Sequence, residues 1–236
     1  MSIPAAIIGA TGYVGGEALR LLGAHPRFEL AAAVSDSRAG QTIAQTFPHL
    51  SAQVGDTAFA AHANWIEQLD SGSDVAVFST MPHGKSAATI ADALERLAQR
   101  NITAHVVDAS ADFRYSSLEA YEAVYGAGHG APELIGEFAS GLPEHVAGKP
   151  AEHVGNPGCF ATAMLLASVP LLASGYTDEH LFITGITGST GSGRSPSDGT
   201  HHPERHSNLY AYKPLGHRHA PEVAEMAAAA SGVAPR

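Results

Sequence analysis

Positive charge and cysteine are both scarce in this 236-residue sequence. Thirteen Lys and Arg stand against 23 Asp and Glu, which gives a formal net charge of -10 with neutral histidines. A general nucleic-acid or anionic-membrane binder would carry the opposite sign. The single cysteine excludes an internal disulfide framework and leaves one thiol that could be reactive.

Long apolar runs are missing as well. The longest candidate, residues 161–173, contains Thr, Ser and Pro and is shorter than the roughly 20 residues of a membrane span. The N-terminus enters an apolar stretch with no positively charged segment before it, which argues against a signal peptide. Since 44% of the residues are hydrophobic and only 15% are charged, we expect a globular, cytoplasmic protein.

The charge is unevenly distributed along the chain. Residues 1–193 carry a net charge of -11, whereas residues 194–236 carry +1 and hold 5 of the 14 histidines. A locally basic, histidine-rich end on an acidic protein indicates a site for an anionic substrate.

Apolar runs alternate with helical patterns in the first part of the chain. Alternating strands and helices predict a parallel sheet with crossover helices. The irregular, Gly- and Pro-rich residues 115–149 predict an excursion from that sheet. The expected strands are 3–8, 28–34, 74–78 and 104–107, and the expected helices are 17–22 and 85–100.

After Cys159 the pattern changes. An apolar helix over 161–173, interrupted by Pro170, precedes two short strand-like runs and a final helix. We therefore predict an α/β protein, with a Rossmann-type NADP-binding domain over 1–155 and an incomplete α+β catalytic domain over 156–236. The two later strands are expected at 181–184 and 209–213, on either side of a polar Gly/Ser loop over 188–203, and the last helix at 221–230.

A glycine-rich turn lies between the first expected strand and helix. In Gly9-Ala-Thr-Gly12-Tyr-Val-Gly15, the first glycine permits a tight turn, the second lets a pyrophosphate approach, and the third allows close helix packing. The N-terminus of the following helix would attract the phosphates. An ordinary glycine turn is the alternative. The candidate cofactor-binding residues here are Gly9, Thr11, Gly12, Tyr13, Val14 and Gly15.

The second expected strand ends in Ser35-Asp36-Ser37-Arg38. At this place in dinucleotide folds an Asp binds the ribose 2′-hydroxyl of NAD, whereas an Arg accommodates the 2′-phosphate of NADP. Ser35, Ser37 and Arg38 together favour NADP. A solvated loop is the alternative.

The only cysteine follows a Pro-Gly turn and precedes the apolar helix, in Asn156-Pro-Gly-Cys159-Phe. A helix N-terminus favours the thiolate, the nucleophilic form of cysteine. A small buried hydrophobe is the alternative.

Two histidines and an arginine crowd the start of the last helix, in Gly216-His217-Arg218-His219-Ala-Pro-Glu222. A histidine can act as base and acid near neutral pH, an arginine can bind carboxylate or phosphate, and Glu222 could orient an imidazole. A solvated basic loop is the alternative. The stretch 201–206 does not fit a zinc motif because Pro203 breaks any helix there, so we predict no metal site.

These motifs together resemble the N-acetyl-gamma-glutamyl-phosphate reductase family, relatives of aspartate-semialdehyde dehydrogenase. The resemblance spans nearly the whole chain and includes the motifs at 9–15, 81–84, 108–114, 141–144, 156–160, 188–194 and 216–222.

The resemblance implies an oxidoreductase of arginine biosynthesis that reduces an acyl phosphate to a semialdehyde with NADPH. Cys159 would form a thioester, and His217 or His219 would move the proton. Gly188 and Gly191 would lie near the nicotinamide. Substrate phosphate and carboxylate contacts are expected from Arg218, Arg114 and Arg194, in that order. The full-length protein would be a homo-oligomer, a dimer or tetramer.

Two other functions stay open. A sibling family reduces aminoadipyl phosphate, or the same group on an acidic carrier protein, in lysine synthesis, and the stretch 201–205 resembles that branch. A non-catalytic NADP sensor is the third reading.

Family members continue for about another third of this length, so we expect this chain to be a fragment, inactive alone, poorly soluble or oligomeric, and little protected from hydrogen exchange beyond Phe182.

Overall fold

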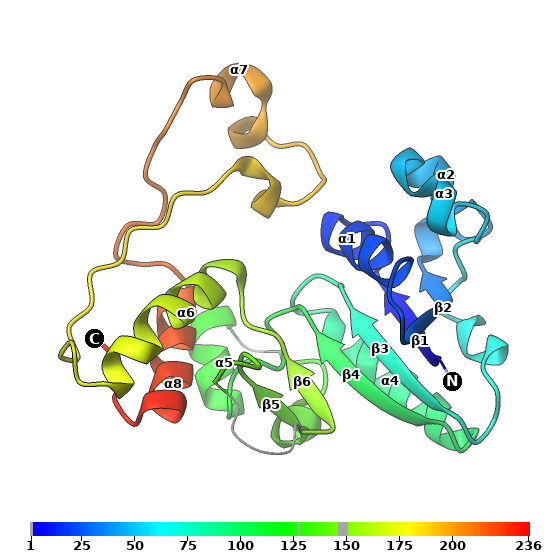
Figure 1. The fold of residues 1–236 in the computed structure, drawn as a ribbon, viewed down its shortest axis with the longest axis horizontal. Coiled ribbons are helices and arrows are strands. Elements are labelled where there is room, and N and C mark those ends of the chain that lie inside the picture. Colours follow the sequence, from blue (N-terminus) through cyan, green and yellow to red (C-terminus); the bar gives the residue numbers. More distant parts are fainter. Residues whose placement is uncertain (1, 127, 146–150) are drawn as a thin grey trace.

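The computed structural model describes residues 2–126, 128–145 and 151–236. Its centre is a parallel sheet of six strands in the order β2-β1-β3-β4-β6-β5 (Figure 1). Crossovers through helices join β1 to β2 and β3 to β4, which confirms the predicted Rossmann-type sheet. The strands are β1 (Ile3–Ile8), β2 (Phe28–Val34), β3 (Asp74–Ser79), β4 (Thr103–Asp108), β5 (Phe138–Ser140) and β6 (His153–Gly155).

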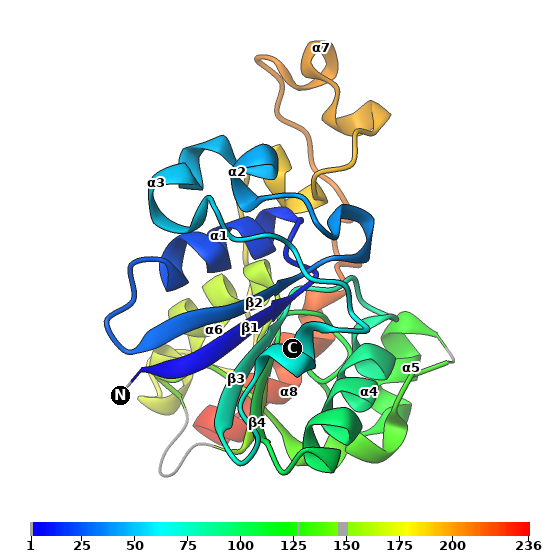
Figure 2. The same cartoon turned by 90° about the vertical axis from the view of Figure 1, so that its right-hand side faces the viewer.

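Both faces of the sheet are covered by helices (Figure 2). The helices are α1 (Tyr13–Leu22), α2 (Ile43–Thr46), α3 (Ser51–Val54), α4 (Ser86–Gln99), α5 (Leu118–Tyr125), α6 (Cys159–Ala173), α7 (His202–Arg205) and α8 (His219–Ser231). Side chains of β1 alternate between the two apolar clusters: Ile7 packs with Leu19 of α1, and Ile8 packs with Ile90 of α4. This burial on both faces explains why the strand is apolar throughout.

Helices α6 and α8 pack against each other beside the β6 end of the sheet (Figure 1). Their contact forms a third apolar cluster, which includes Leu165, Leu172, Val223 and Met226. This packing brings the N-terminal ends of the two helices, and therefore Cys159 and His219, into one region.

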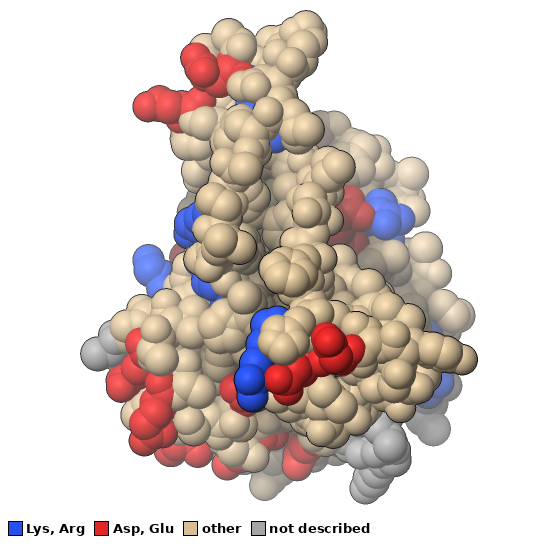
Figure 3. Space-filling view, turned by 90° about the vertical axis from the view of Figure 1, so that its left-hand side faces the viewer, with Lys and Arg blue, Asp and Glu red and all other residues tan. Residues whose placement is uncertain are grey.

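The strands expected at 181–184 and 209–213 are absent, and that prediction was wrong. Residues 177–218 instead form an extended segment that carries α7 and projects from the body, with a mostly uncharged surface (Figure 3). Phe182 is 96% exposed within it. Strand-like apolar patterns form strands only when a partner supplies hydrogen bonds, and these runs pair with no described strand.

The expectation that Pro203 breaks any helix over 201–206 was wrong, because Pro203 lies in the first turn of α7, where its missing N–H is tolerated.

The expected excursion over 115–149 was also wrong in part. It contains α5 and the short strand β5, which pairs with β6 and extends the sheet. A three-residue strand is too short to give an alternating pattern in the sequence.

No described helix has both the length and the apolar character needed to cross a membrane.

Candidate active site

The glycine turn after β1 has the geometry that a pyrophosphate requires. Gly9 has a φ of +79°, a conformation that side chains disfavour, and a Cβ at Gly15 would lie 2.6 Å from the Ala10 backbone. A Cβ at Gly12, by contrast, would meet nothing closer than 3.9 Å. The turn is therefore tight at Gly9, closely packed at Gly15 and open at Gly12, and it fits a dinucleotide at the N-terminus of α1.

The end of β2 lies beside this turn. The Thr11 hydroxyl oxygen is 3.4 Å from that of Ser35, which is 3.2 Å from that of Ser37. The Asp36 carboxylate accepts a hydrogen bond from the His62 N–H at 2.7 Å, and Arg38 donates to Gln41 at 3.0 Å. The structure thus brings the predicted ribose-reading residues together, with the Asp36 carboxylate already bound to backbone.

The second glycine-rich loop reaches the same region. Arg194 donates to the Thr11 carbonyl at 3.1 Å, and its guanidinium lies 5.3 Å from the centre of the Phe47 ring. An open cleft of about 590 Å³ lies between Tyr13 and the loop, lined also by Ser189, Thr190 and His201. Arg194, expected at the substrate, thus contacts the glycine turn, and the loop from Gly188 to Gly193 lies across from Tyr13.

Cys159 is the first residue of α6, two residues before the first buried residue of that helix, Ala161, and its side chain is exposed. Gly158 is the N-cap, and a Cβ there would lie 2.5 Å from the His219 ring. The His219 imidazole therefore lies against the turn that presents Cys159. Only a glycine fits between them.

Two imidazoles follow one another at the start of α8. The His217 and His219 ring centres are 4.7 Å apart, and His217 Nε2 lies 3.2 Å from the Tyr212 hydroxyl. Burial, together with nearby His217, Arg114 and Arg218, lowers the pKa of His219 to about 4. Burial and the charge of Arg218 also lower the pKa of His217. Both rings are therefore neutral near pH 7 and able to accept a proton.

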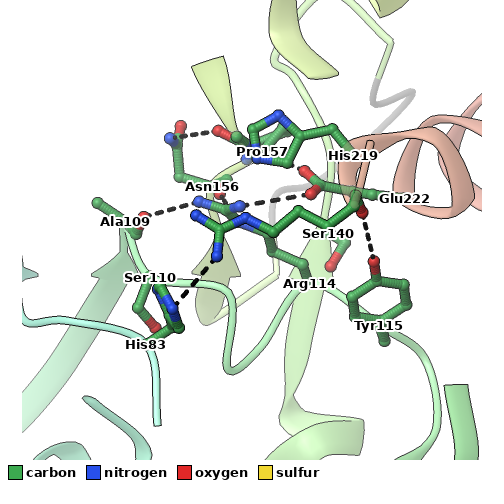
Figure 4. A network of polar contacts seen from close by, with 12 residues as sticks. His83, Ala109, Ser110, Arg114, Tyr115, Ser140, Asn156, Pro157, His219 and Glu222 are labelled. Atoms are coloured by element: carbon green, nitrogen blue, oxygen red, sulfur yellow. Dashed lines mark hydrogen bonds and ion pairs between the residues drawn. The ribbon is translucent and has the colours of Figure 1, made fainter. Parts of the chain in front are cut away.

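Arg114 and Glu222 form a buried ion pair between the loop after β4 and the first turn of α8 (Figure 4). Arg114 Nη1 lies 3.3 Å from Glu222 Oε2, and Glu222 Oε1 accepts the Gly158 N–H at 2.7 Å. We expected Glu222 to orient an imidazole. Among the described residues its hydrogen bonds go to Arg114 and Gly158 instead.

Arg218 is the N-cap of α8 and reaches across to the β3–α4 loop. Its Nη1 donates to His83 Nε2 at 3.3 Å, and its guanidinium lies 5.6 Å from the centre of the Tyr125 ring. Burial and the Arg218 charge lower the pKa of His83. Arg218 keeps an exposed position, unlike the buried Arg114.

Sequence reasoning gave no role to His83 or Tyr212. His83 had a signal, because it lies in the Met81-Pro-His-Gly84 motif just after a strand of the parallel sheet. Tyr212 had none, since its contact with His217 depends on the path of the extended segment. The described residues contain no group of three or more His, Cys, Asp or Glu side chains able to hold a metal ion.

The model of the semialdehyde dehydrogenase NAD binding domain matches residues 4–147, and that of the semialdehyde dehydrogenase dimerisation domain matches residues 159–235. Among solved structures, aspartate semialdehyde dehydrogenase with NADP from Candida albicans is similar with a TM-score of 0.48 and 19% identity, over 76% of this chain and 49% of that chain.

Curated relatives cover nearly all of this chain. N-acetyl-gamma-glutamyl-phosphate reductase of Magnetococcus marinus is 41% identical over 96% of this chain and 63% of its own length, and that of Methanopyrus kandleri is 38% identical over 92% and 61%. The [LysW]-L-2-aminoadipate/[LysW]-L-glutamate phosphate reductase of Saccharolobus solfataricus is 37% identical over 92% and 60%. The chain thus spans somewhat less than two thirds of the length of these relatives. With both domain models matched in order, the chain belongs to the semialdehyde dehydrogenase family.

Proposed function

We propose that this chain carries the reductase site of an N-acetyl-gamma-glutamyl-phosphate reductase, which converts the acyl phosphate to N-acetyl-glutamate semialdehyde in arginine biosynthesis. The observation that carries the proposal is the exposed Cys159 at the start of α6, with the His219 ring against the turn before it. The names of the bacterial and archaeal relatives support this substrate.

Cys159 supplies the nucleophile. Its thiolate attacks the acyl carbonyl carbon, the carbon–oxygen bond to phosphate breaks, and a thioester forms on Cys159. Unpaired N–H groups in the first turn of α6 hold the oxyanion. His217 or His219 takes the thiol proton and later protonates the leaving group.

The glycine turn would hold the pyrophosphate of NADPH, with Ser35, Ser37 and Arg38 around the 2′-phosphate and the Gly188–Gly191 loop near the nicotinamide. When bound, NADPH supplies the hydride that reduces the thioester.

Arg218 is our first candidate for the substrate's anionic groups, since it is exposed at the N-terminus of α8. Of the two other arginines that the sequence suggests, Arg194 contacts the glycine turn and Arg114 lies in the buried ion pair with Glu222. The name of the second domain model supports assembly of the whole protein as a homo-oligomer, a dimer or tetramer. We place the protein in the cytoplasm.

The aminoadipyl branch is the second candidate. The Saccharolobus relative bears that name at nearly the same identity as the others, and the His201–Arg205 stretch is accessible in the projecting segment.

An NADP sensor would have no use for a reactive thiol. Rapid alkylation of Cys159 by iodoacetamide would therefore count against a sensor function.

The test is the reverse reaction. The chain, and the same chain extended to the length of its relatives, are assayed for NADP-dependent oxidation of N-acetyl-glutamate semialdehyde and of its aminoadipate analogue in phosphate buffer. We expect at least a tenfold preference for the glutamate compound. Preference for the analogue would favour the lysine branch, and inactivity of the extended chain on both would overturn the proposal.

A further inference from the structure

The Arg114 side chain has all three guanidinium nitrogens bound to protein. Nε donates to the Asn156 carbonyl at 2.8 Å, Nη2 donates to the Ala109 carbonyl at 2.8 Å, and Nη1 faces Glu222 (Figure 4). The side chain is only 8% exposed. It therefore connects the end of β4, the turn before α6 and the first turn of α8.

Glu222 binds the same turn, which lies directly before Cys159. Its side chain is fully buried and accepts the Gly158 N–H, while the Gly158 carbonyl accepts the Thr162 N–H of α6 at 2.7 Å. With Arg114 on the Asn156 carbonyl, backbone groups on both sides of Pro157 are held by one ion pair.

The charges of Arg114 and Glu222 also bear on a thiolate at Cys159. A lone carboxylate bound one residue before Cys159 would oppose a thiolate, whereas the adjacent guanidinium offsets it. Burial raises the pKa of Glu222, while Arg114 and the Gly158 N–H act in the opposite direction. The pair thus leaves the positive end of α6 uncancelled.

We infer that Arg114 and Glu222 are a positioning pair, which holds the turn before Cys159 and balances the charge beside it, and that neither contacts the substrate. This inference rests on the proposed role of Cys159 as the nucleophile. It changes the expected role of both residues, because each guanidinium nitrogen of Arg114 and both oxygens of Glu222 already have a protein partner.

Other groups near Cys159 stay constant in the test. Burial and the nearby Cys159 raise the pKa of Tyr212, which places its hydroxyl on the thiol side of the site. His217, Arg218 and His219, at the start of α8 or just before it, are also unchanged in the variants. None of them is altered, so a change in thiol reactivity between variants reports on the pair.

The experiment measures the rate of iodoacetamide alkylation against pH, and the single cysteine makes the readout unambiguous. Glu222→Gln keeps an oxygen for the Gly158 N–H and leaves Arg114 unopposed, so the midpoint of the profile should fall by roughly one pH unit. The double variant Arg114→Met/Glu222→Gln removes both charges and should return the midpoint to the wild-type value. Circular dichroism checks that each variant is folded.

The exposed pair Glu17–Arg20 on α1 supplies matched controls, Glu17→Gln and Arg20→Met/Glu17→Gln, which should not move the midpoint. A midpoint that is unchanged or raised in Glu222→Gln, or one that fails to return in the double variant, would overturn the inference.

Turnover gives a second readout. In the extended chain the Glu222→Gln variant should lower kcat and leave KM for the semialdehyde within about twofold. A tenfold rise in KM would assign the pair to substrate contact and overturn the inference. If the wild type has no turnover, the proposed function fails. The alkylation profiles still decide whether Arg114 and Glu222 form a positioning pair.

Discussion

Replacing Cys159 by Ser tests whether its sulfur is the nucleophile. A serine hydroxyl is not ionised near neutral pH, so Cys159→Ser should abolish semialdehyde oxidation. NADP binding, followed by fluorescence titration, should stay within about twofold because the glycine turn belongs to a different part of the fold. Turnover within tenfold of the wild type would contradict the covalent mechanism.

Arg38 is expected to set the choice of cofactor. A hydrogen bond to a charged group contributes about 1.5–3 kcal/mol, so Arg38→Ala should weaken NADPH binding roughly tenfold or more. NADH binding should change little, since it lacks the 2′-phosphate. Arg27→Ala, just before the start of β2 and therefore at the opposite end of that strand, is the matched control. Equal losses for both cofactors would assign the choice to Asp36.

The buried His219 should make stability depend on pH. Its pKa falls from 6.5 to about 4 on folding, so between these values the unfolded state binds more protons than the folded state. The free energy of unfolding should therefore decrease as the pH falls from 6.5 toward 4. His219→Gln should reduce this decrease in urea titrations at pH 7, 6 and 5. Equal pH dependence in both proteins would contradict a neutral, buried His219.

At the level of elements, the β1–α1 turn offers a matched pair of substitutions. Gly15→Ala places a Cβ 2.6 Å from the Ala10 backbone, and overpacking of this kind costs about 1–3 kcal/mol of unfolding free energy. Gly12→Ala has open space and should cost less than about 1 kcal/mol, while still weakening NADP binding at the pyrophosphate. Urea unfolding and NADP titration of both variants test this. Equal stability of the two variants would be inconsistent with the close packing at Gly15.

The sequence predicts this turn well because its information is local. Strand, glycines and helix follow one another within residues 3–22, and the buried strand β1 is apolar throughout because the sheet is covered on both faces. The Arg114–Glu222 pair could not be predicted, since 108 residues separate its members and the motifs gave each of them a separate role. Distant pairing depends on how α8 packs against α6, which no local pattern records.

The same reasoning explains the errors in the second half of the chain. The runs at 181–184 and 209–213 have the apolar character of strands, but hydrogen-bond partners decide whether strands form. The last helix was predicted from Pro221, and the structure begins it at His219. Its packing against α6 was not foreseen.

For the whole molecule, the packing of α8 changes the hydrogen-exchange pattern expected from the sequence. Sequence reasoning predicts little protection beyond Phe182. In the structure, residues 182–218 are mostly exposed, whereas Val223, Met226 and Ala227 of α8 are buried against α6. Protection should therefore be low over 182–218 and should return in α8, because slow exchange follows burial and intact hydrogen bonds.

Hydrogen exchange read by mass spectrometry tests this, at two protein concentrations. We expect slow exchange in β1, β3 and α8 at both concentrations. The exposed Phe182, Ile186, Leu209 and Leu215 favour self-association, so protection over 182–218 should rise with concentration. If α8 exchanges as fast as residues 182–218, the contact between α6 and α8 does not persist in solution. In that case Cys159 and His219 would not share a site in this chain alone, because that contact is what brings the two helix ends together.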